Sequence, residues 1–324
     1  MESSKPELDY EFLPYVRVYK DGHVERLLGT DTIPASLDSR TGVSSKDVPI
    51  IQESAISARL YLPNLISATQ KLPLLVYFHG GGFCVVSTST SMCHHYLNSL
   101  VAEANIVAVS VDYRRAPEHP LPTAYEDSWA ALQWVVSHSN GEGHESWLNS
   151  HADFSRVFLA GDSAGANIAH NIAMLAGRPE VGLGVGLLGV ALVHPYFWGS
   201  QSIGSEATDP ERKAFVDRLW PYVCPSMPDN DDPHINPVAA GAPSLLGLGC
   251  FRVLVCVAEK DVLRDRGWLY YESLARSGWV GVVEITETEG EDHVFHLYNP
   301  TCENAKDLIK RLASFFNRDK PPIL

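Results

Sequence analysis

The sequence VFLAGDSAG, residues 157–165, joins a short apolar run to a Gly-Asp-Ser-Ala-Gly motif, and an Ala-rich helical pattern over 164–175 follows it. A strand that turns sharply into a helix at a Ser between two glycines is the arrangement of a nucleophile elbow, which projects the hydroxyl at the edge of a sheet. The helix N-terminus behind Ser163 also supplies N–H groups and a positive dipole end, which suit an anionic intermediate. A bare G-x-S-x-G arises by chance in roughly one in eight chains of this length. The prediction that Ser163 is a nucleophile therefore rests on the strand-turn-helix context of the motif rather than on the motif alone.

Short apolar runs recur on both sides of this stretch, with helical patterns between several of them. Because these runs are too continuous for strands with one solvated face, they indicate buried, largely parallel strands. The predicted strands are residues 72–78, 106–111, 157–160, 187–193, 252–258 and 281–285, and the predicted helices are residues 125–136, 164–175, 268–275 and 303–316. Strands that alternate with helices need crossover connections, so we predict an α/β fold with a mostly parallel central sheet flanked by helices.

One region, residues 195–243, breaks this alternation. It has no convincing strand, many Pro, Asp and aromatic residues, and one helical stretch over 209–220. An excursion of this length between two sheet strands usually covers a site. The opening segment contains two alternating runs around Asp21-Gly22, which is a hairpin signal. We predict a single domain over residues 1–324, with a cap contributed by about 1–47 and about 195–243.

The composition limits the partners and the compartment. The 324 residues include 25 Lys and Arg and 39 Asp and Glu, a formal net charge of −14. An acidic chain without a local Lys and Arg run repels phosphate backbones, so nucleic-acid binding is excluded. No apolar stretch approaches the roughly 18 residues of a membrane span, and the N-terminus lacks a signal-peptide pattern. The six cysteines form no C-x-x-C pair, which favours free thiols. We expect a soluble, intracellular protein in the cytoplasm, with the nucleus as a second location.

A second motif, His79-Gly80-Gly81-Gly82-Phe83, directly follows the predicted strand 72–78. Three successive glycines lose much backbone entropy on folding, which makes them a poor choice for a merely structural loop. They suit a loop whose backbone approaches a ligand and directs N–H groups at it, as an oxyanion hole requires. A flexible turn or a phosphate-binding loop is the competing interpretation, but no G-K-[ST] follows the glycines.

Taken together, these motifs resemble those of one family. The H-G-G-G loop lies upstream of G-D-S-A-G, with YRRAPE at residues 113–118 between them, and this combination resembles the hormone-sensitive-lipase-like branch of the α/β-hydrolases. Three further segments narrow the resemblance to the plant carboxylesterases: VRVYKDG at 16–22, DPHINP at 232–237 and GEDHVF at 290–295. The resemblance covers about residues 10 to 316. It implies the α/β-hydrolase fold and a serine hydrolase that cleaves carboxylic esters.

The resemblance also implies the chain order nucleophile, acid and His. Asp261, which follows a late predicted strand, is then the acid that fixes the tautomer of the His. Asp261 also suits an N-cap of the next helix, a common use of Asp. Asp265 is the second choice, although it falls inside that helix. His293 matches the family's G-x-D-H-x-F motif and is expected to be the general base for Ser163, with His296 as a packing residue.

The expected reaction is two-step acyl transfer, which needs no cofactor and no metal. The backbone N–H groups of Gly81, Gly82 and Ala164 are expected to form the oxyanion hole. His94 and His95 are a poor metal site, because adjacent residues on a helix point in different directions.

Two other functions stay open on the same scaffold. Some relatives in the family resemble the gibberellin receptor and lack the catalytic His, and others resemble dehydratases or cyclases of plant specialised metabolism. The presence of Ser163, His293 and the unaltered glycines favours hydrolysis. The predicted partner is a small, fairly apolar ester with a short acyl chain, and the sequence indicates no oligomeric state. Six aromatic residues of the 195–243 region could line its pocket or form the core of the cap: Tyr196, Phe197, Trp198, Phe215, Trp220 and Tyr222.

Overall fold

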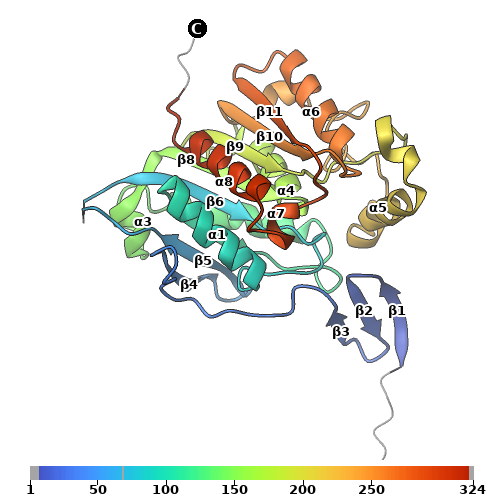
Figure 1. The fold of residues 1–324 in the computed structure, drawn as a ribbon, viewed down its shortest axis with the longest axis horizontal. Helices are drawn as coiled ribbons and strands as arrows, with labels where there is room; N and C mark the ends of the chain where they lie inside the picture. Colours follow the sequence, from blue (N-terminus) through green and yellow to red (C-terminus); the bar gives the residue numbers. More distant parts are fainter. Residues whose placement is uncertain (1–6, 68, 321–324) are drawn as a thin grey trace, which may run out of the picture.

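A mixed sheet of eight strands forms the centre of the computed structural model, which describes residues 7–67 and 69–320 (Figure 1). The strand order is β11-β10-β9-β8-β6-β7-β5-β4. The strands are β4 (Ser44–Ile51), β5 (Ile56–Leu62), β6 (Leu72–Phe78), β7 (Val107–Asp112), β8 (Ala152–Asp162), β9 (Leu187–Val193), β10 (Arg252–Ala258) and β11 (Val282–Thr288). From β7 to β11 all neighbouring strands pair in parallel, and β5 and β4 add antiparallel pairs at one edge. The predicted α/β fold is therefore confirmed.

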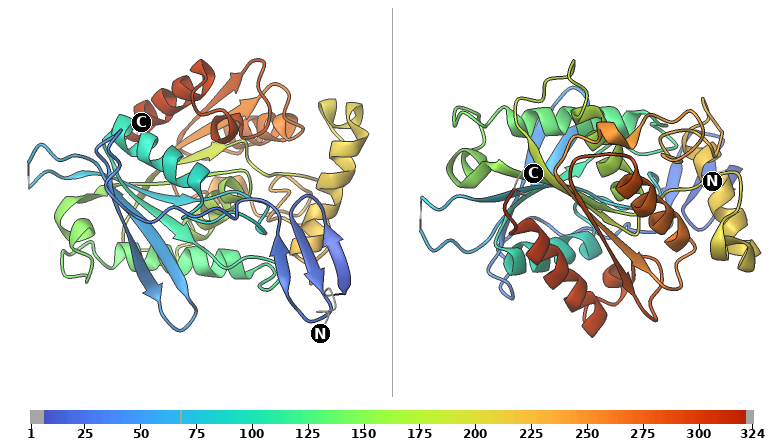
Figure 2. Two further views of the ribbon diagram at one scale, coloured as in Figure 1. Left: turned by 60° about the horizontal axis from the view of Figure 1, so that its bottom comes forward. Right: turned by 90° about the horizontal axis from the view of Figure 1, so that it is seen from above.

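Helices cover both faces of this sheet, as the views in Figure 2 show. One face packs against α1 (Ser91–Ala104) and α8 (Glu303–Phe316), and the other packs against α2 (Thr123–Val136), α4 (Ala164–Ala176) and α6 (Arg264–Arg276). Every residue of β6 and of β9 is buried, because each strand lies inside the sheet with a helix layer on either side. Burial of apolar side chains on both faces is the main stabilising term of such a sheet.

A second layer lies beyond one end of the sheet. Three short antiparallel strands, β1 (Leu8–Phe12), β2 (Val16–Tyr19) and β3 (Val24–Arg26), lie beside α5 (Pro210–Val223) in Figures 1 and 2. The ring of Phe12 stacks on that of Tyr222 with centroids 4.5 Å apart, and Phe12 and Tyr15 each lie 5.4 Å from Phe215. Aromatic contacts therefore join the first strands of the chain to a helix from its second half. We call β1–β3 together with α5 the end layer.

The remaining helices are short. They are α3 (Ser146–His151), α7 (Phe295–Tyr298) and the 3₁₀ helices η1 (Gly204–Thr208) and η2 (Leu245–Gly247). The described chain has no strand between β9 and β10, as expected for residues 195–243. β4 begins at Ser44, so the last residues of the 1–47 segment lie in the main sheet rather than in the end layer.

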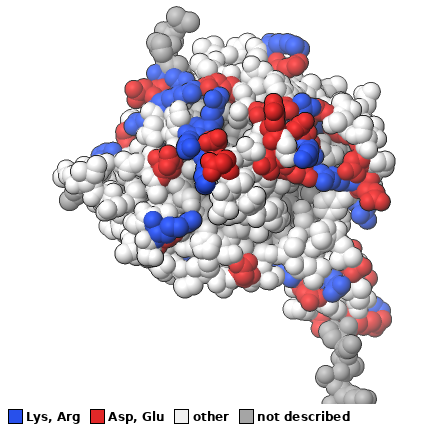
Figure 3. Space-filling view, in the orientation of Figure 1, with Lys and Arg blue, Asp and Glu red and all other residues white. Residues whose placement is uncertain are grey.

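No helix within residues 7–67 and 69–320 is long and apolar enough to cross a membrane. On the face shown in Figure 3, acidic and basic side chains are interspersed.

Candidate active site

Ser163 stands at the sharp turn between β8 and α4, where the sequence predicts a nucleophile elbow. Its backbone has φ 53° and ψ −117°, a conformation that a non-glycine residue adopts only at a cost and that occurs often at functional sites. A Cβ on Gly165 would lie 1.9 Å from the carbonyl oxygen of Phe78, and a Cβ on Gly161 would lie 2.3 Å from the backbone of Gly165. Both flanking glycines are therefore required by the close approach of α4, β8 and β6.

His293 and Asp261 reach Ser163 from two neighbouring loops at the same end of the sheet. His293 Nε2 lies 2.9 Å from Ser163 Oγ, and His293 Nδ1 lies 2.6 Å from Asp261 Oδ2. The second carboxylate oxygen of Asp261 accepts the N–H of Leu263 at 2.9 Å, just before α6. Asp261 thus both orients the imidazole and shapes the turn into the helix. Asp265, the second choice, lies in the first turn of α6 and accepts hydrogen bonds from Ser205 instead.

The surroundings of His293 favour its protonated form. Partial burial lowers the pKa of His293, but the negative charge of Asp261 and the hydrogen bond to it outweigh this effect. Asp162 and Asp292 contribute in the same direction, and the pKa of His293 is raised above its ordinary value. An imidazole with a raised pKa is a stronger base toward the Ser163 hydroxyl.

Two further histidines pack beside His293. His194 directly follows β9, is buried, and accepts the N–H of Val294 on Nδ1 at 3.0 Å. Burial holds the pKa of His194 well below its ordinary value and lowers the pKa of His296 to about 3, so both are neutral. The sequence interpretation of His296 as a packing residue agrees with this burial. The role of His194 as a support for the His293 loop was missed, although its place at a strand end was a usable signal.

Metal binding has one geometric candidate among the described residues. Ligand atoms of His194, Asp261 and His293 lie within 4.8 Å of one another. Both nitrogens of His293 are, however, within hydrogen-bond distance of Asp261 and Ser163. These hydrogen bonds account for the cluster without an ion.

The loop between β6 and α1, residues 79–90, lies against the same site, and we call it the glycine loop. Gly81 and Gly82 have φ angles of +96° and +58°, which favour glycine. A Cβ would lie 2.2 Å from the Val85 carbonyl oxygen at Gly81 and 2.5 Å from the Tyr15 ring at Gly82. In the described part of the chain, the N–H groups of Gly81, Gly82 and Ala164 have no backbone acceptor. Their role as oxyanion donors stays a prediction.

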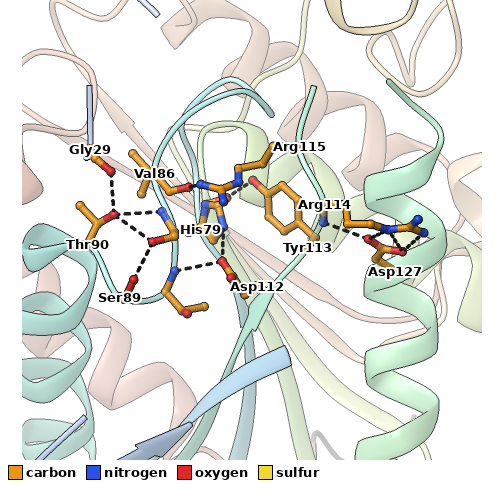
Figure 4. Close-up of polar contacts among 12 residues, drawn as sticks. Gly29, His79, Val86, Ser89, Thr90, Asp112, Tyr113, Arg114, Arg115 and Asp127 are labelled. Carbon is orange, nitrogen blue, oxygen red and sulfur yellow. Dashed lines mark hydrogen bonds and ion pairs between the residues drawn. The ribbon is translucent and has the colours of Figure 1, made fainter. Parts of the chain in front are cut away.

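A polar network joins residues of the glycine loop to the segment that follows β7 (Figure 4). The His79 ring stacks on Tyr113 with centroids 4.3 Å apart, and the Tyr113 hydroxyl donates to the His79 carbonyl at 2.7 Å. Burial lowers the pKa of His79 to about 4, so its ring is neutral. Arg115 donates to the carbonyl of Val86 at the far end of the loop. On the side of the elbow, Asp162 accepts the N–H of Gly80 at 3.2 Å.

Two cavities of unequal size meet at Ser163 and His293. The larger has a volume of about 1020 Å³ and reaches the end layer. The smaller has a volume of about 100 Å³ and runs along the glycine loop. Of the six candidate aromatic residues, Tyr196 and Phe215 line the larger cavity, and the rest do not line either cavity: Phe197, Trp198, Trp220 and Tyr222.

Comparisons with known proteins agree with this geometry. Residues 75–297 match the α/β hydrolase fold family. Probable carboxylesterase 2 of Arabidopsis thaliana is 51% identical over 98% of this chain and 99% of its own length. A 2-hydroxyisoflavanone dehydratase of Glycyrrhiza echinata is 49% identical over 97% of both chains. The crystal structure of a thermostable carboxylesterase cloned from a metagenomic library superposes with a TM-score of 0.71 at 27% identity, covering 89% of this chain and 90% of the other.

Proposed function

Because this chain belongs to the α/β-hydrolase fold family, on its plant carboxylesterase branch, we propose that it hydrolyses esters through Ser163, His293 and Asp261. The chain is a carboxylesterase, in agreement with relatives of that name and with the esterase structures that share its fold. The assignment of the three residues rests on one observation, the continuous hydrogen-bonded chain from Ser163 Oγ through the imidazole to Asp261, with distances of 2.9 and 2.6 Å.

In the first half of the reaction, Ser163 Oγ attacks the ester carbonyl carbon while His293 Nε2 takes its proton. The carbonyl oxygen becomes negatively charged and is stabilised by the N–H groups of Gly81, Gly82 and Ala164, which lack backbone acceptors. His293 then gives the proton to the leaving alcohol oxygen. The acyl group remains on Ser163 as an ester.

In the second half, water attacks the acyl group on Ser163, and His293 takes and returns a proton in the same way. Asp261 stays ionised throughout. It fixes the proton of the imidazole on Nδ1 and stabilises the imidazolium that forms twice in each cycle. The three groups therefore need no metal or cofactor for either step.

The test is the release of p-nitrophenol from p-nitrophenyl acetate by the wild-type protein and by Ser163→Ala. We expect the variant to lose about four to six orders of magnitude in kcat, because the nucleophile is absent. Ser139→Ala, an exposed serine, is the matched control and should behave as wild type. Equal rates for wild type and Ser163→Ala would contradict the assigned nucleophile.

Dehydration is the second candidate, since the Glycyrrhiza echinata relative with 49% identity is named a 2-hydroxyisoflavanone dehydratase. His293 would abstract a proton from the carbon beside the one that carries the hydroxyl, and the hydroxyl would leave with a proton as water while the C=C bond forms. Incubation with 2-hydroxyisoflavanone, followed by mass spectrometry for loss of water, separates the two reactions. Efficient dehydration together with absent p-nitrophenyl acetate hydrolysis would favour this candidate.

The end layer acts as part of a cap over the site. This cap comprises residues 195–243 and the segment that precedes β4. Tyr15, Leu28 and Phe215 from these segments line the larger cavity and support this assignment.

We place the protein in the cytoplasm, because its cysteines are all free thiols: Cys84, Cys93, Cys224, Cys250, Cys256 and Cys302. Confocal imaging of the full chain fused to a fluorescent protein tests this location, and an organellar signal would overturn it.

A further inference from the structure

Arg26, the last residue of β3, connects the end layer to the glycine loop. Its Nε donates to the carbonyl of Cys84 at 2.8 Å, and its Nη1 and Nη2 donate to the two carboxylate oxygens of Glu118 at 2.9 and 2.8 Å. Glu118 belongs to the segment that follows β7. One guanidinium group therefore joins three parts of the chain that are far apart in the sequence: the end layer, the glycine loop and the segment after β7.

The pair with Glu118 fixes the direction of the guanidinium. A bidentate pair of this kind adds geometric specificity to the attraction of the two charges. Partial burial raises the pKa of Glu118, but the hydrogen bond from Arg26 and its positive charge outweigh this effect, and the pKa lies below its ordinary value. The Arg26 side chain is only 21% exposed. Both partners are therefore charged, and the Nε of Arg26 is held toward the carbonyl of Cys84.

The glycine loop needs a restraint from outside, because part of its backbone is strained. Phe83 and Val86 have φ angles of +60° and +70°, which residues other than glycine adopt only at a cost. Such strain persists only where the surrounding structure holds the backbone in place. Cys84 lies between these two residues, so its carbonyl is a point at which a donor can hold the strained stretch.

A displacement of Cys84 would be transmitted to the predicted oxyanion donors. The N–H groups of Cys84 and Val85 both donate to the carbonyl of Gly81 at 3.0 Å. Gly81 therefore moves together with the turn that Arg26 holds. Its own N–H group and that of Gly82 are two of the three predicted donors to the oxyanion.

The end layer contacts the glycine loop at two further points, so Arg26 belongs to a continuous interface. The Tyr15 ring lies so close to Gly82 that a Cβ there would be 2.5 Å from it. Just after β3, the carbonyl of Gly29 accepts the hydroxyl of Thr90 at 3.2 Å (Figure 4). Arg26 itself lines neither cavity at Ser163. Any effect of Arg26 on the reaction must therefore pass through the loop.

We propose that Arg26 is a positioning residue of this esterase: by holding the carbonyl of Cys84 from the end layer, it keeps the glycine loop in the conformation that directs its N–H groups at the oxyanion. The inference rests on the proposed function, since the oxyanion forms when Ser163 attacks an ester. The oxyanion hole is then complete only while the end layer is docked. Because the negative charge develops in the transition state, loss of Arg26 should lower kcat and leave KM nearly unchanged.

The first experiment measures kcat and KM for p-nitrophenyl acetate in Arg26→Met, which keeps an unbranched side chain but removes all its donors. We expect kcat to fall by about 10- to 10²-fold, because a small misplacement of catalytic groups costs up to about 10²-fold. Arg26→Lys keeps the charge without the fork that binds Glu118, so its kcat should lie between those of Arg26→Met and wild type. Thermal unfolding midpoints show which variants are folded, and Arg26→Lys decides the result if Arg26→Met is not.

The matched control is Arg17→Met, which removes another arginine of the end layer. Arg17 pairs with Glu11 at 3.3 Å inside that layer, and its side chain is 41% exposed. This variant should behave as wild type. A wild-type kcat in the folded Arg26 variant would overturn the proposal. Equal losses in Arg17→Met and Arg26→Met would also overturn it, because they would assign the effect to the end layer in general.

The second experiment uses phenyl trifluoromethyl ketone, which imitates the tetrahedral intermediate. Ser163 Oγ adds to its carbonyl carbon, the hydroxyl proton passes to His293, and the former carbonyl oxygen becomes negatively charged. The inhibition constant in Arg26→Met should rise by the same factor by which kcat/KM falls. An unchanged inhibition constant would show that Arg26 does not act through the oxyanion hole. Absence of hydrolysis in the wild type, or full activity in Ser163→Ala, would instead refute the proposed function.

Discussion

At the scale of single residues, His293 is the group through which pH acts on the reaction. The charge of Asp261 raises its pKa against the opposing effect of burial, and Asp162 and Asp292 add to that rise. Only the neutral imidazole can take the proton of Ser163. Hydrolysis is therefore full at a pH above the pKa of His293 and is lost as the pH falls through it, at a higher pH than an ordinary histidine would give.

Asp292→Asn tests this electrostatic account. The substitution removes one negative charge that raises the pKa of His293. The Asn oxygen can still accept the backbone N–H of His293, which Asp292 Oδ1 accepts at 2.7 Å. We expect the acidic limb of the kcat/KM profile to move to lower pH, with little change of kcat on the alkaline plateau. The measurement is the rate of p-nitrophenyl acetate hydrolysis from about pH 5 to 9.

The control for this shift is Asp307→Asn, which removes an exposed charge on α8 paired with Lys310. It should leave the acidic limb in place. A limb that stays fixed in Asp292→Asn, or that moves equally in both variants, would show that Asp292 does not act on His293.

Sequence reasoning went furthest for residues whose type is dictated by the backbone. The sequence predicted that the crowded turn requires glycine at positions 161 and 165. A Cβ at Gly161 or Gly165 would indeed lie too close to neighbouring backbone atoms. Asp261 and His293 were named as partners of Ser163 by the resemblance to the plant carboxylesterases, and parallel strands that end at one edge of the sheet bring the three residues together. The place of His194 at the end of β9 was a usable signal, but its contact with Val294 depends on the path of the loop after β11 and was not predicted.

At the scale of whole elements, the buried strands were the easiest to predict. Residues 72–78, 187–193 and 252–258 match β6, β9 and β10, because a strand covered on both faces is apolar without interruption. The helix α1 was missed, since His94 and Asn98 interrupt its apolar pattern on a buried face. These two side chains hydrogen-bond to each other, a compensation that becomes visible only in three dimensions. The edge strand β4 was missed because half of its residues are polar and none is fully buried.

The glycine loop between β6 and α1 gives the prediction at this scale. In Gly81→Ala, the added Cβ would lie 2.2 Å from the Val85 carbonyl oxygen, so the loop must shift and move its N–H groups. We expect kcat for p-nitrophenyl acetate to fall by about 10²- to 10³-fold, the effect of losing one oxyanion donor. Rates and thermal unfolding midpoints of the variant and wild type provide the measurement.

Gly141→Ala is the matched control, because Gly141 also has a positive φ, +80°, but no atom lies within 4 Å of the added Cβ. Both variants carry the same type of backbone strain, of about 1 kcal/mol. Only Gly81→Ala should lose activity. A comparable loss of kcat in the two variants would assign the effect to strain in general rather than to the oxyanion loop.

At the scale of the whole molecule, a buried ion pair fastens the 195–243 region to the α/β core. Arg266 on α6 lies 2.5 Å from Glu206 of η1, and the two side chains are 5% and 0% exposed. Arg266 also donates to the carbonyl of Gln201. Residues that follow η1 in α5 line the larger cavity, so this pair supports the shape of the site from outside it.

Glu206→Gln should therefore destabilise the protein strongly. The variant leaves the charge of Arg266 buried without its counter-ion, and we expect the free energy of unfolding to fall by about 3–5 kcal/mol. Glu303→Gln, which breaks the exposed pair of Glu303 with Lys306, should lower it by less than about 1 kcal/mol. Urea denaturation followed by tryptophan fluorescence gives both values. A small effect of Glu206→Gln would show that Arg266 finds another partner.

The end layer has a consequence for how the protein is made. Its strands β1–β3 leave the ribosome early, whereas α5, which supplies Phe215 and Tyr222 as their partners, is synthesised much later. Until then the rings of Phe12 and Tyr15 lack the surface that covers them in the finished protein. His293 emerges later still, after β11. A nascent chain therefore carries its nucleophile well before its base, and hydrolytic activity begins only when translation is nearly complete.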